Sequence, residues 1–325
     1  MASPFSGLEV EKELRPTAAA LAFDLTLALT SVVALEARIS DGASTAEALG
    51  THRVGNGVVI GVEGLVLTIG YLITEADEVI LTTGDGRRVP AHVLGADQAT
   101  GFGLVHALEP LDLPALAIGD SRLLRGKDRV ISAGAGGRAH AQSSRLLARA
   151  PFAGYWEYYL EEALFVTPAH PHWSGAALIN QTGELVGIGS LRVEQRAPNG
   201  DIHPLNMFVP AEFLTPILAD LSSGRPPHPP RPWLGVIAQE FESHVVVVNV
   251  SPGGPAEVAG LEEGDLIHAI GGERVTDLAG FYQRLWALGT PGAVAKLAVQ
   301  RDDELLHFEI PTGDRGARLK KRRLN

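Results

Sequence analysis

Hydrophobic residues recur in short runs over the first two thirds of the chain, and the runs are bounded by Gly, Asp or Pro. Short apolar runs between turn residues predict β-strands rather than helices. Gly84-Asp85-Gly86 is a strong hairpin signal between two such runs. Regularly spaced strands favour a β-barrel or a β-sandwich. The first set of strands is expected at 31–39, 57–62, 65–68, 78–82, 88–96 and 102–107.

A second series of apolar runs follows, and two comparable sets of strands predict two barrels side by side. The second set is expected at 115–118, 129–133, 144–150, 155–160, 164–167, 176–180, 185–191 and 206–209. Helices are expected at 16–29, which is rich in Ala and Leu, and at 210–221.

The Pro-rich segment 222–232 is the clearest domain boundary in the chain. After it, residues 233–313 predict a compact α+β module with one amphipathic helix that begins after Asp277. The apolar positions of this helix are Leu278, Phe281, Tyr282, Leu285 and Leu288. Strands are expected at 234–238, 245–250, 266–270, 295–301 and 304–310.

Composition narrows the classes of function. The 325 residues include no cysteine, which excludes disulfides, thiol chemistry and Cys-ligated metal sites, and no cofactor is expected. A net charge of -11 argues against nucleic acid and anionic membranes as general partners. The chain end is basic, which predicts either a solvated tail or an arm that docks on an acidic partner. Its cations are Arg315, Arg318, Lys320, Lys321, Arg322 and Arg323.

The N-terminal region has mixed charges where an export signal would be basic, and Asp24 interrupts the apolar stretch that follows. The remaining apolar stretch, 25–35, is too short to cross a bilayer. A cytoplasmic location without a membrane span is therefore expected.

Ser174 lies in a tight turn between His170 and an apolar strand, which is how a chymotrypsin-like barrel presents its nucleophile. With this turn and several other segments, the chain resembles the HtrA (Deg) serine proteases, which join a trypsin-like double barrel to a PDZ domain. The resemblance covers roughly residues 20–312, and it is most specific in the PDZ motifs. The similar segments are 55–60, 64–68, 113–121, 208–210, 231–236, 251–256 and 259–267.

The catalytic motifs depart from the family pattern. The resemblance places the triad histidine at Tyr71 and the triad aspartate at Gly101, so that only the nucleophile, Ser174, remains. A serine hydroxyl needs a neighbouring base held in position by a third group. A phenol, whose pKa is near 10, is a poor substitute at neutral pH. His172 also replaces the glycine that, in the family, helps to form the oxyanion hole.

Two alternatives give this turn a catalytic or metal-binding role. His170 or His172 could act as a relocated base for Ser174, or the two histidines could share a metal ion. The plainer interpretation is a pair of loop histidines, with Trp173 packing over the former cleft.

The PDZ resemblance implies a groove that binds a peptide C-terminus as an added strand. The carboxylate loop is expected at Trp233, Leu234, Gly235 and Val236, the receiving strand continues through Ile237 and Ala238, and Phe281 and Leu285 line the wall with Tyr282. The alternative is that these apolar residues form the core and that the groove is vestigial or filled by the chain itself.

The sequence thus predicts a mainly β protein with an N-terminal segment (1–30), a degenerate trypsin-like domain (31–221), a linker (222–232), a PDZ domain (233–313) and a basic tail (314–325). The expected function is that of a pseudoprotease acting as an adaptor, assembly factor or holdase, and homo-oligomers are compatible with the resemblance. The competing hypotheses are a hydrolase with a rearranged site at Ser174 and a structural subunit of a larger complex.

Overall fold

The computed structural model describes residues 9–17, 21–61, 63–196 and 200–320. The chain divides into two compact units. The first comprises the described residues of Met1–Ala150, Glu162–Pro227 and Lys320–Asn325, and the second comprises Pro151–Glu161 and His228–Leu319. Strands dominate both units, which confirms the mainly β prediction.

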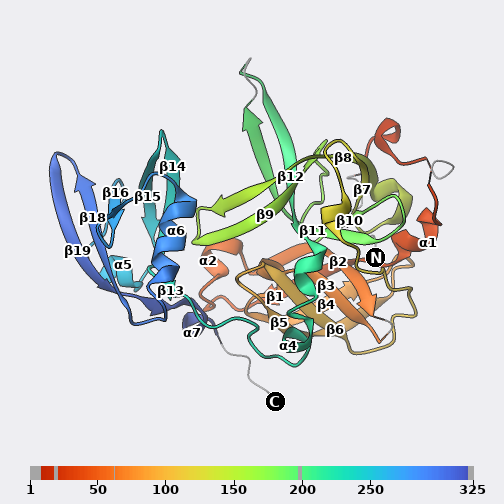
Figure 1. The fold of residues 1–325 in the computed structure, drawn as a ribbon. Coiled ribbons are helices and arrows are strands. Elements are labelled where there is room, and N and C mark those ends of the chain that lie inside the picture. Colours follow the sequence, from red (N-terminus) through yellow and green to blue (C-terminus); the bar gives the residue numbers. More distant parts are fainter. Residues whose placement is uncertain (1–8, 18–20, 62, 197–199, 321–325) are drawn as a thin grey trace. The chain divides into compact units, whose positions relative to one another are not determined.

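Two closed barrels form the first unit (Figure 1). The first barrel has the order β1-β2-β3-β6-β5-β4, and Leu35, Leu67, Leu81, Phe102 and Leu104 are fully buried in it. Its strands are β1 (Val32–Ile39), β2 (His52–Gly61), β3 (Leu65–Ile69), β4 (Ala76–Thr82), β5 (Arg88–Ala96) and β6 (Phe102–Ala107). A single turn of helix, α3 (Gly70–Ile73), follows β3 directly and carries Tyr71.

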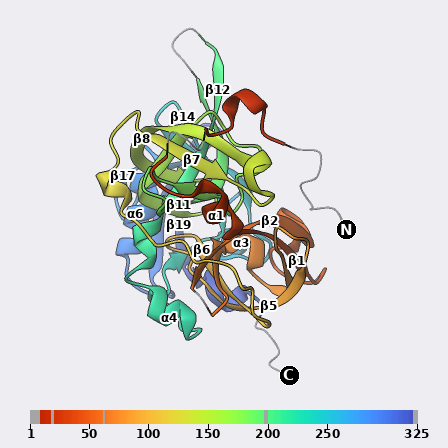
Figure 2. The same ribbon diagram turned by 90° about the vertical axis from the view of Figure 1, so that its right-hand side faces the viewer.

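The second barrel has the order β10-β11-β12-β9-β8-β7, and its core includes Val130, Leu164, Leu178, Val186 and Phe208. Its strands are β7 (Arg129–Ala133), β8 (Ala141–Gly154), β9 (Tyr158–Thr167), β10 (Ala177–Ile179), β11 (Leu185–Arg196) and β12 (Ile202–Pro210). The far ends of β11 and β12 project beyond the barrel, as both views show (Figure 2). Ser174 lies in the turn that precedes β10.

Several elements differ from the sequence prediction. The segment expected as a strand at 115–118 makes only an isolated bridge, because its backbone bonds are divided between Val59 of β2 and Leu185 of β11. The helix expected at 210–221 is broken into a 3₁₀ turn, Ala211–Leu214, and α4 (Leu218–Ser222). Pro216 lies at the break, where it lacks the N–H that a continuous helix requires.

The N-terminal helix is also shorter than expected. In the part of 16–29 that the structure describes, α1 (Leu25–Thr30) begins after Asp24, whose carboxylate accepts a hydrogen bond from the Leu27 N–H at 3.1 Å. The expected helix therefore starts at this cap. Residues 18–20 of the prediction lie outside the described residues. The other short helices of this unit are α2 (Ala46–Leu49) and the 3₁₀ turns Lys12–Leu14, Ser121–Leu123 and Gly137–His140.

In the second unit, a sheet of order β14-β15-β16-β18-β19 packs against α6 (Leu278–Ala287). Its strands are β14 (Val236–Phe241), β15 (His244–Val250), β16 (Leu266–Ile270), β18 (Val294–Arg301) and β19 (Glu304–Pro311), with β17 (Glu273–Arg274) beside β16. A small second sheet pairs β13 (Pro232–Trp233) with β20 (Gly313–Asp314), and the helices are completed by α5 (Pro255–Val258) and α7 (Arg315–Arg318).

Two features of this unit differ from expectation. Residues 151–161, expected within the trypsin-like domain, belong to the second unit because their polar groups bond to residues 234–238. The tail is not free of contacts where it is described: Arg318 donates to the carbonyls of Gly253 and Pro252 at 2.7 and 2.6 Å. Lys320 forms an ion pair with Asp77 at 3.2 Å within the first unit, and residues 321–325 of the expected tail lie outside the described residues.

Candidate active site and peptide groove

Asn56 of β2 clamps the turn that carries Ser174. Its backbone N–H donates to the Ser174 carbonyl at 2.8 Å, and its side-chain amide donates to the carbonyls of Ser174 and His172 at 2.9 and 3.0 Å. Its side-chain oxygen accepts from the Ala135 N–H at 2.8 Å. Because Asn56 is fully buried, these bonds join the two barrels at the nucleophile position.

The Ser174 hydroxyl is bound to a phenol. Tyr71 Oη lies 2.7 Å from Ser174 Oγ and 2.9 Å from the carbonyl oxygen of Ser190. A phenol carries one proton, and a carbonyl oxygen can only accept. Both contacts are satisfied together when Tyr71 donates to Ser190 and Ser174 donates to Tyr71. In that arrangement the serine proton points at a neutral phenol oxygen, which is a very weak base.

The surroundings hold this phenol in its neutral form. Burial raises the pKa of Tyr71 to about 12, against the opposing effect of hydrogen bonds from Ser174 and Trp173. Gly101 lies beside it, since the Gly70 N–H donates to the Gly101 carbonyl at 2.7 Å. The φ of Gly101 is +85°, in the left-handed region that favours glycine.

His170 is fully occupied by structural bonds. Its Nε2 lies 3.0 Å from the His140 carbonyl oxygen, and its Nδ1 accepts from the His172 N–H at 3.0 Å. These partners require the neutral ring with its proton on Nε2. Burial, with a smaller effect of His172, lowers the pKa of His170 to about 4. The same bond turns the His172 N–H, an expected oxyanion donor, toward the His170 ring.

The two histidines that were considered for a metal site lie with ring centroids 5.9 Å apart. His170 could bind a metal only by giving up one of its two ring bonds. Among the described residues there is no cluster of three or more His, Cys, Asp or Glu side chains that could hold a metal ion. Trp173 is half-buried, and its proposed packing over the cleft stays a prediction.

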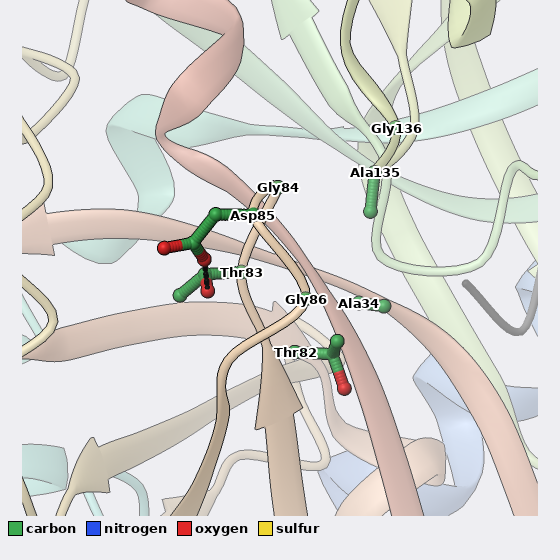
Figure 3. Close-up of a pocket in the computed structure, with 8 residues that line it drawn as sticks. All are labelled: Ala34, Thr82, Thr83, Gly84, Asp85, Gly86, Ala135 and Gly136. Carbon is green, nitrogen blue, oxygen red and sulfur yellow. Dashed lines mark hydrogen bonds between the residues drawn. The ribbon is translucent and has the colours of Figure 1, made fainter. Parts of the chain in front are cut away.

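A pocket of about 230 Å³ lies elsewhere in the first unit (Figure 3). It is lined by residues 82–86, Ala34, Ala135 and Gly136, and by neither Tyr71 nor Ser174. Its carboxylate, Asp85, is bonded to the hydroxyl of Thr83, which lowers the Asp85 pKa. The pocket therefore does not contain Ser174.

In the second unit, the expected carboxylate loop does hold a carboxylate, and it comes from the chain itself. The backbone N–H groups of Leu234, Gly235 and Val236 donate to Glu157 Oε1 at 3.2, 2.6 and 3.0 Å. Further along the expected receiving strand, the Ala238 N–H donates to the Tyr155 carbonyl at 2.9 Å.

The remaining predicted groove residues occupy different environments. Phe281 and Leu285 are fully buried in the core of the unit, and Ile237 is half-buried. Trp233 is buried, and the Arg318 guanidinium lies 5.3 Å from its ring centroid.

Sequence reasoning missed Asn56, Ser190 and Glu157. An Asn in the apolar run of β2 was a local signal for a buried polar group that needs partners. Nothing local marked Glu157, whose partners in the loop are 77 to 79 residues away.

Comparison with known proteins agrees with the two-barrel unit and the α+β unit. Residues 55–188 match the trypsin-like peptidase domain, and residues 232–312 match the PDZ domain. A protein of Pseudomonas fluorescens named as a probable periplasmic serine endoprotease, DegP-like, is 27% identical over 275 residues. The chain belongs to the HtrA family. The match spans 81% of this HtrA-family chain and only 56% of the relative.

Another relative and two solved structures give similar matches. A protein of Halomonas elongata with the same description is 26% identical, with 81% of this chain and 57% of the relative covered. Among solved structures, the HtrA-type protease AlgW with tripeptide has a TM-score of 0.53 at 21% identity and covers 92% of this chain and 98% of its own. The serine endoprotease from Yersinia pestis has a TM-score of 0.52 at 22% identity, with coverages of 90% and 99%. At such identities the structural likeness describes the fold.

The expected cytoplasmic location is wrong, because the matching relatives are named as periplasmic enzymes. The misleading signal was the mixed charge of residues 9–15. In the part of the chain that the structure describes, the helices are too short or too polar to cross a membrane.

Proposed function

We propose that this HtrA-family chain is a pseudoprotease that binds proteins through its PDZ domain. The observation that carries the proposal is the 2.7 Å contact between Tyr71 Oη and Ser174 Oγ at the place where the family resemblance puts the catalytic imidazole. The neutral phenol offers no general base, and the left-handed Gly101 offers no carboxylate. The occupied His172 N–H further weakens the case for an oxyanion hole.

The competing hydrolase would use Ser174 with a nearby histidine. Against it, both ring nitrogens of His170 are bonded, and Ser174 Oγ has the Tyr71 hydroxyl as its partner. The relatives named as serine endoproteases keep this alternative worth testing.

An active-site-directed fluorophosphonate tests the chemistry. The full-length chain should be incubated with a fluorescent probe of this class, and its casein cleavage measured, beside Ser174→Ala. We expect no labelling above that of Ser174→Ala and no cleavage by either protein. Labelling of the wild type at a useful rate, lost in Ser174→Ala and in His172→Ala, would establish the hydrolase instead.

As a binding protein, the chain would act as an adaptor, assembly factor or holdase, and the PDZ domain would take peptide C-termini. A role as a subunit of a larger complex predicts a stoichiometric partner that is lost when residues 315–325 are deleted. The named relatives favour a periplasmic location, which cell fractionation would check.

The binding role is tested by capture from the native cell with the full chain and with a chain truncated after Arg231. Partners held by the full chain and lost on truncation support PDZ-mediated binding. Ser174→Ala should retain the same partners, since the proposal gives the hydroxyl no part in binding.

A further inference from the structure

The edge of the PDZ sheet is covered by the tip of the β8–β9 hairpin, residues 151–161. β14 is the last strand on its side of the sheet, with β15 as its only sheet neighbour among the described strands. An edge strand leaves alternate N–H and C=O groups free to pair with another chain. The hairpin tip belongs to the same compact unit as this edge.

Glu157 supplies the central contact. Its carboxylate accepts backbone hydrogen bonds from Leu234 and Gly235 before β14 and from Val236, the first residue of β14, with the shortest, from Gly235, at 2.6 Å. The residue is 7% exposed, so water has little access to it. A row of backbone amides around one carboxylate is how a PDZ domain holds the terminal carboxylate of a peptide. Here a side chain supplies the same chemical group.

The tip also makes a backbone contact with the strand edge. Val236 and Ala238, two residues apart on β14, direct their N–H groups to Glu157 and to the Tyr155 carbonyl respectively. From the opposite wall, the Tyr282 hydroxyl of α6 donates to the Gly154 carbonyl at 2.9 Å. The tip therefore contacts both β14 and α6, the two elements that the PDZ resemblance makes the walls of a peptide groove.

The hairpin tip is shaped to present this carboxylate. Three residues, Tyr155, Trp156 and Glu157, connect the two strands, and Glu157 has a φ of +55° in the left-handed position that glycine usually takes in such loops. The Trp156 ring stacks on Tyr158 at 5.4 Å between centroids. A side chain at Gly154 would meet the Trp156 ring at 2.7 Å, so the ring would have to move to admit one.

We propose that the hairpin tip is an internal ligand of the PDZ groove, in which the Glu157 carboxylate occupies the site of a peptide's terminal carboxylate. A partner peptide then has to displace the tip, and it must itself carry a free α-carboxylate. The competition between tip and peptide rests on the proposed peptide-binding function, whereas the occupancy of the groove by the tip does not.

Amide exchange measures the occupancy without any ligand. In the full chain, the N–H groups of Gly235, Val236 and Ala238 should exchange slowly, because each donates to the hairpin. Glu157→Ala removes the carboxylate that accepts from the loop amides, and we expect exchange at these amides to rise at least tenfold. The matched control is Glu161→Ala, an exposed glutamate of the same hairpin, which should change nothing.

A second variant guards against misfolding. Tyr282→Phe removes the hydroxyl contact to Gly154 and leaves the loop and Glu157 intact, so a smaller rise at the Ala238 amide is expected. Equal exchange in the wild type, Glu157→Ala and Tyr282→Phe would overturn the internal-ligand proposal.

Peptide binding is scored separately. The probe is a fluorescein-labelled peptide pool with three randomised C-terminal residues, in free-acid and amidated forms. We expect the free-acid pool to bind Glu157→Ala at least tenfold more tightly than the wild type, and the amidated pool to bind neither. Equal binding to both proteins would refute competition. If neither protein binds while exchange still differs, occupancy is supported and the proposed peptide-binding function fails.

Discussion

Acidification should destabilise the first unit through His170. The ring is fully buried, and its Nδ1 accepts a hydrogen bond that a proton on the same atom would destroy. Burial, followed by the nearby His172, lowers the pKa of His170 from 6.5 to about 4. Between these values the unfolded chain takes up a proton that the folded chain refuses. Stability is therefore lost as the pH falls through this range.

The size of the effect follows from the pKa difference. Each pKa unit corresponds to about 1.4 kcal/mol, and the interval between pH 7 and pH 4.5 covers most of the difference between the folded and unfolded values. His170 alone should then remove about 2 kcal/mol of unfolding free energy over this interval. That is a large share of the roughly 5–15 kcal/mol of a typical domain.

The assay compares urea unfolding at pH 7 and pH 4.5, followed through the amide signals of β10. His170→Gln should reduce the loss of stability between these pH values by about 2 kcal/mol relative to the wild type. The control His203→Gln, an exposed histidine of the same unit, should leave that loss unchanged. A His170 ring signal that titrates near pH 6.5, or an equal loss in His170→Gln and the wild type, would refute the reasoning.

Three further predictions concern the other buried groups. Asn56→Ala should cost about 2–4 kcal/mol by leaving the Ala135 N–H and the His172 carbonyl without their partner, whereas the exposed Gln195→Ala should cost less than about 0.5 kcal/mol in the same denaturation series. The double variant Tyr71→His, Gly101→Asp should remain unlabelled by fluorophosphonate, since the His172 N–H stays bound to His170 and the new aspartate needs a left-handed backbone; rapid labelling would show that the oxyanion site is intact. Burial raises the pKa of Glu157 from 4.5 to about 7, although its three amide donors and the nearby Arg315 act in the opposite direction. Tyr282 also faces this carboxylate. The contribution of Glu157 to the stability of the fold is therefore full below pH 4.5 and is lost as the pH rises through about 7. Denaturation of the second unit from pH 5 to pH 8 should show this loss in the wild type and not in Glu157→Gln, and a flat difference between the two would contradict it.

The order of the elements and much of the candidate site could be predicted from the sequence. Strand periodicity and turn residues predict both barrels, and the family motifs point to Tyr71 and Ser174, which the structure places in contact. The carboxylate loop at 234–236 could be predicted in the same way, because its motif is local. The break at Pro216 also had a local cause that the helix prediction overlooked.

What could not be predicted depends on contacts between distant residues. The partners of the Asn56 side chain lie 79 to 118 residues away, and any polar residue in a strand has many candidates. Glu157 reads as an ordinary charged residue of a turn. Only the folded chain shows that its carboxylate meets the amides of Leu234 and Gly235.

Because Glu157 and the amides that bind it are parts of one polypeptide, the concentration of the tip at the groove does not fall when the protein is diluted. A tethered segment acts at an effective concentration on the order of millimolar. A free peptide that matched the tip's contacts with a Kd of about 1 µM would then bind the occupied groove with an apparent affinity roughly a thousandfold weaker. Only a partner that is abundant, multivalent or held close by other contacts would displace the tip, so the hairpin sets a threshold for engagement that binding to an isolated PDZ domain would miss.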